Sequence, residues 1–540
     1  MINLVPLVPE IFLAIAAMGM LIVGAFCGAS SVRVVSWACA FGVVITACLL
    51  MNMSWDARST LNAMFRFDNF AAVLKLIILL GLLAAIALSV RYLKDQDIQR
   101  FEYPVLVLLS GVGMMLMVSA NNMLSLYVGL ELQSLSLYVL AAINRNSLRG
   151  AEAGIKYFVL GALSSGLLLF GISLIYGFSG TLDFDAIASF LSSAEDIPFG
   201  ITFGLVFMLA GLAFKISAVP FHMWTPDVYQ GAPTSVTAFF AMVPKIAAFA
   251  LLIRLLFGPF GMLVEQWVQI LYFLSAASMI VGAFAAIAQE NIKRLLAYSS
   301  IGHMGYALIG LVAASETGVA AVILYLLIYM VMSAGVFAVV LSMRRDGLSV
   351  YKISDLSGLS EHSPAMAYGL AILMLSMAGI PPLAGFFGKL VIFESAIEQG
   401  YYVLAVLGVL SSVVAAYYYL RIIKVMFFDA AADAFDGDLP FARRAVLLIS
   451  IVFVFGFVFK PAPIMQSVQD AAASLFFIES TDAVEEPILD IEGVIERLED
   501  NLEEVLDKKP DADEVDIGID LGDDSAQQGQ KDAPISPEQQ

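Results

Sequence analysis

Long apolar runs separated by short polar segments recur along most of this 540-residue chain. A helix needs about 20 predominantly apolar residues to cross the hydrocarbon core of a bilayer, and fourteen runs approach that length. They lie near residues 4–26, 34–52, 69–90, 104–120, 122–143, 153–177, 201–221, 233–256, 267–288, 296–313, 319–342, 365–398, 402–427 and 445–459. The pattern predicts an all-α polytopic membrane protein with about fourteen transmembrane helices.

Two of these runs combine helix-breaking prolines with a lysine. Pro220 follows Lys215 by five residues, and Pro381 and Pro382 precede Lys389. Proline removes a helical hydrogen bond, and freed backbone groups survive inside a bilayer only where protein or a watery cavity covers them. Because the two breaks are about five spans apart, the second copy is inverted in the membrane. The sequence therefore predicts two inverted five-helix repeats, each containing a broken helix.

The repeats predict how the chain is divided. Three N-terminal helices precede the first repeat (helices 4–8), and the second repeat (helices 9–13) is followed by a last transmembrane helix and an acidic tail. The N-terminal helices are expected at residues 1–103, the first repeat at 104–258 and the second repeat at 259–428. The last transmembrane helix is expected at 429–460 and the tail at 461–540.

The tail differs in composition from the rest of the chain. Overall, 60% of the residues are hydrophobic, 14% are charged and the mean hydropathy is +0.88, which excludes an ordinary soluble globular protein. The net charge of −19 lies almost entirely in the tail, so it says nothing about a substrate. Apolar residues recur at helical spacing between residues 491 and 506, which predicts an amphipathic helix. Disorder is predicted from Pro510 onward.

Ionisable side chains also fall inside the apolar runs. Glu131 lies near the middle of the fifth run, Lys245 follows Pro244 in the eighth, and His303 lies in the tenth. Such residues are costly in a bilayer and often mark an ion pathway. Movement of a nearby carboxylate changes the proton affinity of a buried lysine, which suits a proton carrier. The candidate residues are Glu131, Lys156, Lys215, Lys245, His303 and Lys389.

Two of these candidates have a second interpretation. Lys156 lies one turn after Glu152, so it either pairs with that carboxylate at the helix mouth or reaches inward towards Glu131. His303 is as compatible with core packing as with a proton relay. Both alternatives stay open on the sequence alone.

Other polar residues are interpreted mainly as structural. Lys75 either snorkels its ammonium towards the headgroups or is functional, and Glu10, near the end of its run, favours a structural role. His222, Trp224 and Asp227 lie in a polar segment at the end of the seventh run. We expect them at interface depth, with Asp227 accepting freed backbone amides rather than transferring protons.

Neither a disulfide framework nor a metal site is predicted. Cys27, Cys39 and Cys48 lie in or beside the first two runs without a CxxC or Cys/His spacing, so we interpret them as packing residues. Haem ligation is disfavoured because two of the three histidines lie at the ends of runs.

Loop charge predicts the orientation. With loops assigned alternately, most basic loop residues fall on one side, including Lys293 and Arg294, which we interpret as cytoplasmic anchors. The other side holds only Arg58, Arg66, Arg254 and Lys460. The positive-inside bias then places both termini outside the cytoplasm, on the periplasmic side in a bacterium.

Five motifs resemble a known family. GLELQSLSLYVL, EAGIKYF, FKISAVPFHMWTPDVYQGAPTSVTAFFAMVPK, NIKRLLAYSSIGHMGY and AGIPPLAGFFGK are similar to the antiporter-like subunits of the proton-pumping NADH:quinone oxidoreductase, respiratory complex I. The resemblance covers roughly residues 1–460, and the run TPDVYQGAPT points to the subunit N type. The H-x-W-x-P-D element is also shared with Mrp-type cation/proton antiporters, which remain the alternative. A purely structural membrane scaffold is a third interpretation.

The resemblance implies fourteen helices with two inverted repeats in the bacterial inner membrane, or the mitochondrial inner membrane for an organellar protein. Its pattern places a proton pathway at Glu131, Lys156, Lys215, Lys245 and Lys389, with His303 and water bridging. It implies no cofactor or metal in this chain. NADH, FMN, iron–sulfur clusters and quinone are expected in partner subunits. The expected partners are other membrane subunits, including sister antiporter-like subunits, and no nucleic acid.

Overall fold

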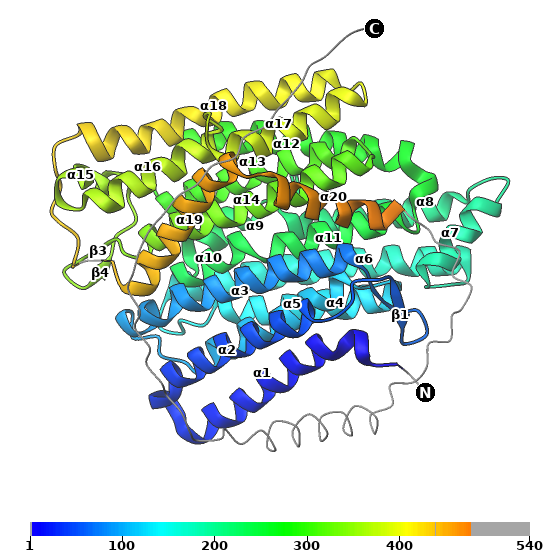
Figure 1. Ribbon diagram of the computed structural model, residues 1–540, viewed down its shortest axis with the longest axis horizontal. Helices are drawn as coiled ribbons and strands as arrows, with labels where there is room; N and C mark the ends of the chain where they lie inside the picture. The colour runs from blue at the N-terminus through cyan, green and yellow to red at the C-terminus, as the bar shows by residue number, and fades with distance from the viewer. Residues whose placement is uncertain (1–2, 438, 477–540) are drawn as a thin grey trace, which may run out of the picture. The chain divides into compact units, whose positions relative to one another are not determined.

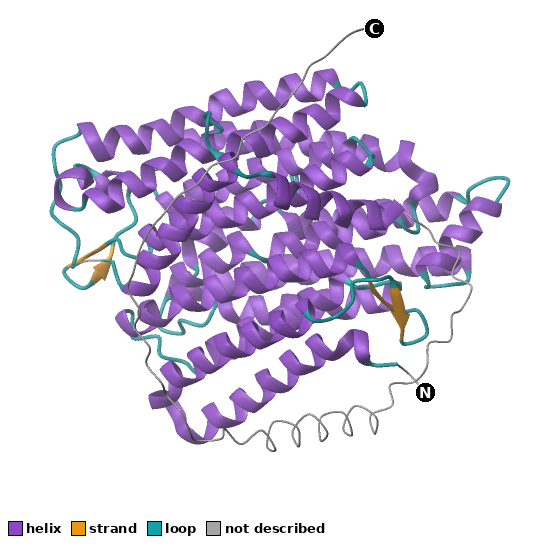
Figure 2. Cartoon of the chain, viewed as in Figure 1, coloured by secondary structure: helices purple, strands orange, loops and turns teal. Residues whose placement is uncertain are grey.

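Helices form almost all of the structure, a computed structural model that describes residues 3–437 and 439–476 (Figures 1 and 2). In chain order the α-helices are α1 (Val8–Cys27), α2 (Val32–Met51), α3 (Asn69–Asp95), α4 (Glu102–Val118), α5 (Met123–Ala141), α6 (Leu148–Ser179), α7 (Phe184–Ser193), α8 (Phe199–Ile216), α9 (Trp224–Gly231), α10 (Thr234–Met242), α11 (Pro244–Phe257), α12 (Val264–Ile287), α13 (Ile292–Val312), α14 (Glu316–Val340), α15 (Leu359–His362), α16 (Pro364–Ala378), α17 (Ala384–Glu398), α18 (Tyr402–Phe428), α19 (Phe441–Phe459) and α20 (Ala462–Phe476). Short 3-10 helices lie at Val5–Leu7, Gly28–Ser31, Gly261–Leu263 and Ile353–Leu356.

Two small antiparallel hairpins lie at opposite ends of the helices (Figure 2). Strand β1 (Arg58–Thr60) pairs with β2 (Phe65–Phe67), with Arg58 opposite Phe67. Strand β3 (Arg344–Arg345) pairs with β4 (Leu348–Ser349), with Arg344 opposite Ser349. The first hairpin connects α2 to α3, and the second lies between α14 and the short helix α15.

The helices confirm the predicted all-α polytopic membrane fold. Within the described residues, twelve helical segments are long and apolar enough to cross a bilayer, and α4 and α16 are shorter apolar helices. The expected number of fourteen spans and the inverted repeats stay predictions.

The predicted helix breaks are present. Helix α8 ends at Ile216, and Ser217 takes a left-handed conformation with φ 65°. Helix α16 ends at Ala378, and Gly379 does the same with φ 86°. A third break separates α10 from α11, where Pro244 is the first residue of the new helix, a position that needs no backbone N–H donor. Each break lies beside one of the candidate lysines.

Close helix contacts depend on glycine. A Cβ on Gly113 of α4 would lie 2.5 Å from the backbone nitrogen of Gln133 on α5. A Cβ on Gly282 of α12 would lie 2.5 Å from the backbone nitrogen of Gly302 on α13. Small residues allow this approach of backbones, which is how many membrane helices associate. The first helix pair of each predicted repeat therefore packs in the same way.

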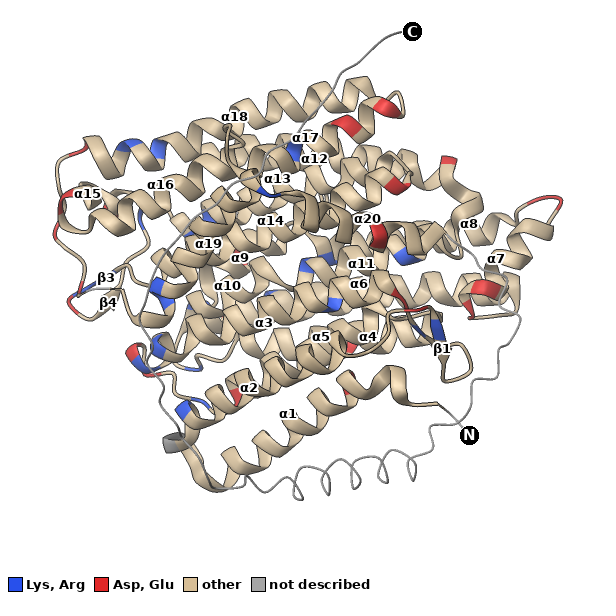
Figure 3. Cartoon of the chain, in the orientation of Figure 1, with Lys and Arg blue, Asp and Glu red and all other residues tan. Residues whose placement is uncertain are grey.

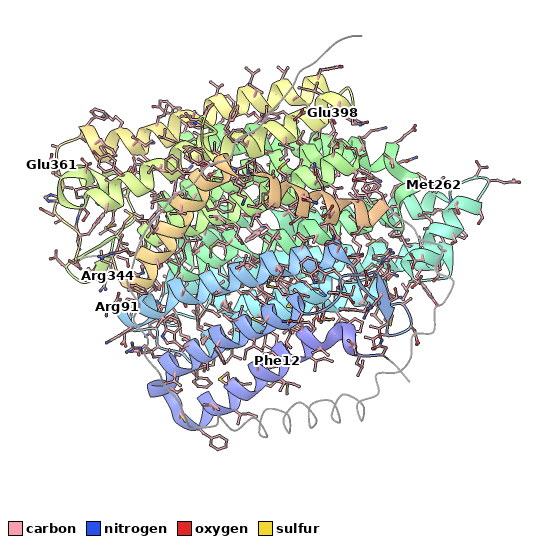
Figure 4. The ribbon with its side chains drawn as sticks, in the orientation of Figure 1. Phe12, Arg91, Met262, Arg344, Glu361 and Glu398 are labelled. Carbon is pink, nitrogen blue, oxygen red and sulfur yellow. The ribbon has the colours of Figure 1, made fainter. Side chains whose placement is uncertain are left out.

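Charged residues gather mainly at the two ends of the helices (Figure 3). Arg91, Arg344 and Glu361 lie at one end, whereas Met262 and Glu398 lie at the other (Figure 4). Most of the surface basic residues are at the first end, which also carries β3 and β4 (Figure 3). The assignment of loops to the two sides of the membrane stays a prediction.

The compact unit extends beyond the boundary expected at residue 460. Helix α20 buries Val468, and the backbone N–H of Phe70 donates to Oγ of Ser474 at 3.1 Å. The rings of Phe257 and Phe476 lie 5.2 Å apart between centroids. The start of the expected tail is thus a packed amphipathic helix. The helix expected between residues 491 and 506 and the disorder expected from residue 510 lie outside the described residues.

Candidate functional site

The first broken helix places Lys215 against hydroxyl groups. Lys215 lies in the last turn of α8, and its Nζ donates to Oγ of Ser134 at 2.8 Å, the hydroxyl of Tyr138 at 3.3 Å and Oγ of Ser165 at 3.4 Å. These groups come from α5 and α6. Glu131 lies three residues before Ser134 on the same face of α5, and its Oε1 is buried without a hydrogen-bond partner among the described residues. The structure thus brings Glu131 and Lys215 into one region.

Lys156 lies outside this region. Its Nζ is 2.8 Å from Oε1 of Glu152 and 2.8 Å from Oδ2 of Asp227, and 42% of the side chain is exposed. The pairing with Glu152 is therefore the alternative that the structure contains. The ammonium points to Asp227 rather than to Glu131.

Asp227 joins two cations, contrary to our expectation that it accepts backbone amides. Besides the bond from Lys156, its Oδ1 accepts a hydrogen bond from Arg294 at 2.7 Å. Burial would raise the pKa of Asp227, but the hydrogen bonds and charges of Lys156 and Arg294 hold it below its ordinary value. The carboxylate thereby links α6, α9 and α13.

The second lysine is buried at the break before α11. The side chain of Lys245 is 2% exposed, and its Nζ donates to Oγ of Ser300 at 2.5 Å. The ammonium also lies 5.7 Å from the ring centroid of Tyr229. Lys245 therefore has only neutral partners, and Ser300 connects it to α13.

His303 lies on the same face of α13 as Ser299 and Ser300, between two tyrosines from other helices. Its Nδ1 is 2.6 Å from the hydroxyl of Tyr325, and its Nε2 is 3.0 Å from the hydroxyl of Tyr419. The Tyr419 hydroxyl is also 2.5 Å from Oγ of Ser299. Both ring nitrogens of this buried histidine are therefore in a hydrogen-bonded chain, as a relay requires.

The third lysine holds the other broken helix. Nζ of Lys389 donates to the carbonyls of Met377 at 3.1 Å and Ala378 at 3.0 Å, and to Oγ of Ser412 at 2.8 Å. The two carbonyls belong to the last turn of α16, where no helical N–H reaches them. Lys389 thus caps a helix end that the break exposes.

His303 and Lys389 border one closed space. Tyr306 and Tyr419 also line it, and the ammonium of Lys389 lies 4.9 Å from the ring centroid of Tyr306. No volume remains there for a water molecule. The water bridge expected beside His303 is therefore not accommodated between these two residues in this conformation.

The sequence did not indicate that Lys293 is buried. Its side chain is 2% exposed, and Nζ donates to the carbonyl of Ala232 at 2.6 Å, at the end of α9. Lys293 was expected to be a cytoplasmic anchor, but the neighbouring α9–α10 turn encloses its ammonium. Its neighbour Arg294 instead reaches Asp227. Only their position next to each other at a helix start was visible in the sequence.

Two buried ion pairs lie away from the three lysines. Lys75 and Glu10 are 0% and 2% exposed, with Nζ and Oε1 2.6 Å apart, so snorkelling of Lys75 is wrong. Arg254, which we had assigned to a loop, forms a two-pronged contact with Asp68 at 2.8 and 2.9 Å. Each pair links helices that are distant in sequence, and no local pattern reveals the partner.

Metal ligation has no support in the described part of the chain. No group of three or more His, Cys, Asp or Glu side chains there could hold an ion. The side chains gathered at this site carry amines, hydroxyls, carboxylates and one imidazole.

Comparisons with known proteins agree with the motifs. Residues 120–415 match a family model described as NADH:quinone oxidoreductase/Mrp antiporter, transmembrane. NADH-quinone oxidoreductase subunit N of Paramagnetospirillum magneticum is 52% identical over 479 residues, which cover 88% of this chain and 98% of that protein. Subunit N 1 of Rhizobium meliloti is 54% identical over 473 residues, covering 87% and 97%.

Solved structures give the same fold. A chain of respiratory complex I from Thermus thermophilus with bound aureothin has a TM-score of 0.74 and 33% identity, covering 86% of this chain and 99% of that one. A chain of the Mrp complex from Dietzia has the same TM-score at 23% identity, covering 87% and 97%, and shows the fold alone. The match to curated relatives over nearly their whole length shows that this chain belongs to the family of NADH-quinone oxidoreductase subunit N.

Proposed function

We propose that this chain moves protons across the membrane, coupled to quinone reduction in other subunits of an NADH-quinone oxidoreductase. The pathway consists of the side chains that the motifs singled out. They are Glu131, Lys156, Lys215, Lys245, His303 and Lys389.

The observation that carries this proposal is the type of partner at the three lysines. Lys215, Lys245 and Lys389 hydrogen-bond to hydroxyls and carbonyls, and in the described residues none of them forms an ion pair. By contrast, the buried Lys75 is paired with Glu10. Loss of a proton from a paired lysine would leave a buried carboxylate without its counter-ion, which is costly. Lysines with neutral partners avoid that cost and suit proton transfer.

The hydrogen bonds suggest how the parts are connected. Ser300 accepts from Lys245, and the adjacent Ser299 bonds to Tyr419, which bonds to His303. Transfer onward to Lys389 requires side chains to move or water to enter, because the space between His303 and Lys389 is closed. We propose that charge movement at Glu131 drives such rearrangements through Lys215.

Lys156 has a different place in this scheme. It is partly exposed and bound to Asp227 at one end of the bundle. We assign it to the exposed start of the pathway, where its charge acts on Glu131 and Lys215 without contacting either. Its pairing with Glu152 and Asp227 holds that charge in a defined position.

The remaining chemistry belongs to partner subunits. We propose that NADH, FMN, iron–sulfur clusters and quinone bind there and that this chain holds no redox centre, so that it acts as the translocating part of the enzyme. Its partners are other membrane subunits, including sister antiporter-like subunits. The end that is rich in basic residues faces the cytoplasm of a bacterial inner membrane, which places Glu398 and Met262 on the periplasmic side (Figures 3 and 4).

Proton pumping by a Lys215→Ala variant tests the proposal. Inverted membrane vesicles are supplied with NADH, and acidification is measured with a pH-sensitive dye while quinone reduction and complex assembly are followed in parallel. The matched control is Lys94→Ala, which removes an exposed lysine at the end of α3. We expect pumping and quinone reduction to fall in Lys215→Ala and to remain normal in the control.

Normal pumping by an assembled Lys215→Ala complex would reject the central lysines as a pathway and favour the scaffold interpretation. The Mrp-type antiporter alternative predicts cation exchange by the chain without NADH-quinone oxidoreductase partners. Identity of about half to subunit N over nearly its whole length favours the oxidoreductase.

A further inference from the structure

A cavity of about 560 Å³ lies between α4, α5 and α6, outside the proposed pathway. It is at the end of the bundle where α4 begins and α5 ends. Val139, Ile155 and Phe158 line it and are 54%, 65% and 51% exposed, so the cavity opens to the side of the bundle. Its volume falls within the roughly 300–1,000 Å³ range of small-molecule sites.

The end of this cavity near the loops carries three charged groups. Arg100 and Arg145 line it, and neither forms an ion pair within the described residues. Glu102, the first residue of α4, also lines it, and its Oε2 is buried without a hydrogen-bond partner in the same part of the chain. A buried carboxylate oxygen that lacks a donor is costly. The site therefore presents two guanidinium groups and one carboxylate beside an apolar wall, and the carboxylate must turn Oε2 out of its buried position to accept from a ligand.

These groups match one class of ligand. Guanidinium groups bind phosphate through paired hydrogen bonds, and basic sites between membrane helices are typical positions for lipid headgroups. A primary ammonium supplies the N–H donor that Glu102 lacks, whereas a quaternary choline has no N–H to donate. We propose that this cavity binds phosphatidylethanolamine, with the phosphate at Arg100 and Arg145, the ammonium at Oε2 of Glu102 and an acyl chain along Val139, Ile155 and Phe158.

The headgroup chemistry favours a lipid over a helix of a neighbouring subunit. An apolar helix would cover the wall but leave the charged groups of Arg100, Arg145 and Glu102 without partners in a dehydrated space, which is unfavourable. An anionic lipid without an ammonium would satisfy the arginines and place more negative charge beside Glu102. Of the ethanolamine, choline and glycerol headgroups, only the ethanolamine headgroup satisfies all three.

The position of the cavity gives the bound lipid a consequence for the pathway. Tyr138 lines the cavity, and its hydroxyl lies 3.3 Å from Nζ of Lys215. The acyl chain would fill the space on the outer side of Tyr138 and keep water from reaching Lys215 along this route. Lipid binding itself does not depend on proton transfer.

Photolabelling of the assembled complex tests the assignment. The purified complex is incubated with dioleoyl phosphatidylethanolamine that carries a photoactivatable group on one acyl chain, and labelled peptides are identified by mass spectrometry. The same experiment is run with the phosphatidylcholine and phosphatidylglycerol analogues. We expect the ethanolamine lipid to label the peptides that contain Val139, Ile155 and Phe158 more strongly than either of the other two.

Variants distinguish binding through the headgroup contacts from non-specific apolar binding of the acyl chain. Arg145→Ala is expected to lower this labelling about tenfold, the effect of losing a hydrogen bond to a charged group. Glu102→Gln is expected to keep binding but remove the preference for ethanolamine over choline, and Ile155→Trp to fill the cavity and abolish labelling. Arg33→Ala, which removes an exposed arginine away from the cavity, serves as the control and should match the wild type.

Several results would overturn the assignment. Equal labelling by the ethanolamine and choline lipids, an unchanged preference in Glu102→Gln, or cross-links only to a neighbouring subunit would each do so. If Arg145→Ala fails to assemble, Glu102→Gln and Ile155→Trp still decide the question, because neither removes a positive charge.

Discussion

The hydroxyl of Tyr419 and Nε2 of His303 are joined by a hydrogen bond of 3.0 Å in the interior of the helical bundle. The same hydroxyl reaches Ser299, so one phenol links the imidazole to the serines beside Lys245. In a proton pathway the Tyr419 hydroxyl passes protons along this link, whereas in a packed core only the volume of the ring matters.

Tyr419→Phe distinguishes these roles. The ring volume is kept and both hydrogen bonds are lost, so we expect normal assembly with NADH-driven pumping reduced roughly tenfold or more, as for removal of a positioned proton-transfer group. Dye-monitored acidification of inverted vesicles measures the effect. Tyr402→Phe, an exposed tyrosine at the start of α18, is the control. Unchanged pumping in Tyr419→Phe would assign the network to packing.

The pair of Glu10 and Lys75 makes a prediction about assembly rather than pumping. Lys75→Met leaves a buried carboxylate alone, which costs about 3–5 kcal/mol, so we expect less assembled complex and a lower melting temperature. Glu10→Gln combined with Lys75→Met removes both charges and should recover most of the loss. Native gels measure the amount of assembled complex, and thermal unfolding of the purified complex measures its melting temperature. If the double variant assembles no better and melts no higher than Lys75→Met, the two charges do not act mainly on each other.

The ion cluster around Asp227 predicts a particular pH dependence. Lys156 and Arg294 lower the pKa of Asp227, so its contribution is complete above the unfolded value of about 3.9 and is lost only as the pH falls through the lower folded value. Between pH 6 and 8 the cluster should therefore not change.

Asp227→Asn imitates the acidic state at neutral pH. Because the side chains of Asp227 and Lys156 are 36% and 42% exposed, we expect a stability loss of about 1 kcal/mol or less. The effect on pumping should be larger, since Lys156 loses the partner that positions its charge. Pumping profiles between pH 6 and 8 for wild type, Asp227→Asn and Asp227→Glu test this. If Asp227→Glu keeps the contacts to Lys156 and Arg294 but still pumps poorly, the position of the carboxylate matters rather than its charge.

The glycine contact between α12 and α13 predicts a strong steric effect. Gly282→Ala places a methyl group 2.5 Å from the backbone nitrogen of Gly302, and forcing helices apart typically costs about 1–3 kcal/mol. Gly166→Ala on α6 has nothing within 4 Å of the new methyl group and serves as the matched control. We expect the melting temperature of the complex to fall for Gly282→Ala and not for Gly166→Ala. Equal melting temperatures would show that α12 and α13 move apart without a cost in stability.

Local chemistry explains which parts of the fold the sequence predicts well. The breaks beside Pro220 and Pro381 are local, because proline disrupts the helix in which it lies whatever surrounds it. Helix α20 was also within reach, since Val468, Ala471 and Ala472 recur at helical spacing. This short apolar face is followed directly by a strongly acidic segment.

Long-range partners explain what the sequence does not predict. Nothing near Lys75 points to Glu10, and nothing in a helix start distinguishes the buried Lys293 from Arg294 beside it. Consecutive helical residues point about 100° apart, so two adjacent cations meet different surroundings. The charge of each was readable from the sequence, but its partner depends on helices packed against it.

Lys215 and Lys389 differ in what they touch. An ammonium donates three hydrogen bonds and a neutral amine only two, although the amine also accepts one. The three partners of Lys215 are hydroxyls, and any of them can turn its own hydrogen towards the amine. Two of the three partners of Lys389 are carbonyls, which have no hydrogen to offer. Deprotonation therefore leaves the contacts of Lys215 intact, because any one of three hydroxyls can reverse. At Lys389 only Ser412 can reverse, and to do so it must turn its hydrogen away from the carbonyl of Ala378, to which it donates at 3.2 Å. The end of α16 therefore loses one hydrogen bond when that proton leaves.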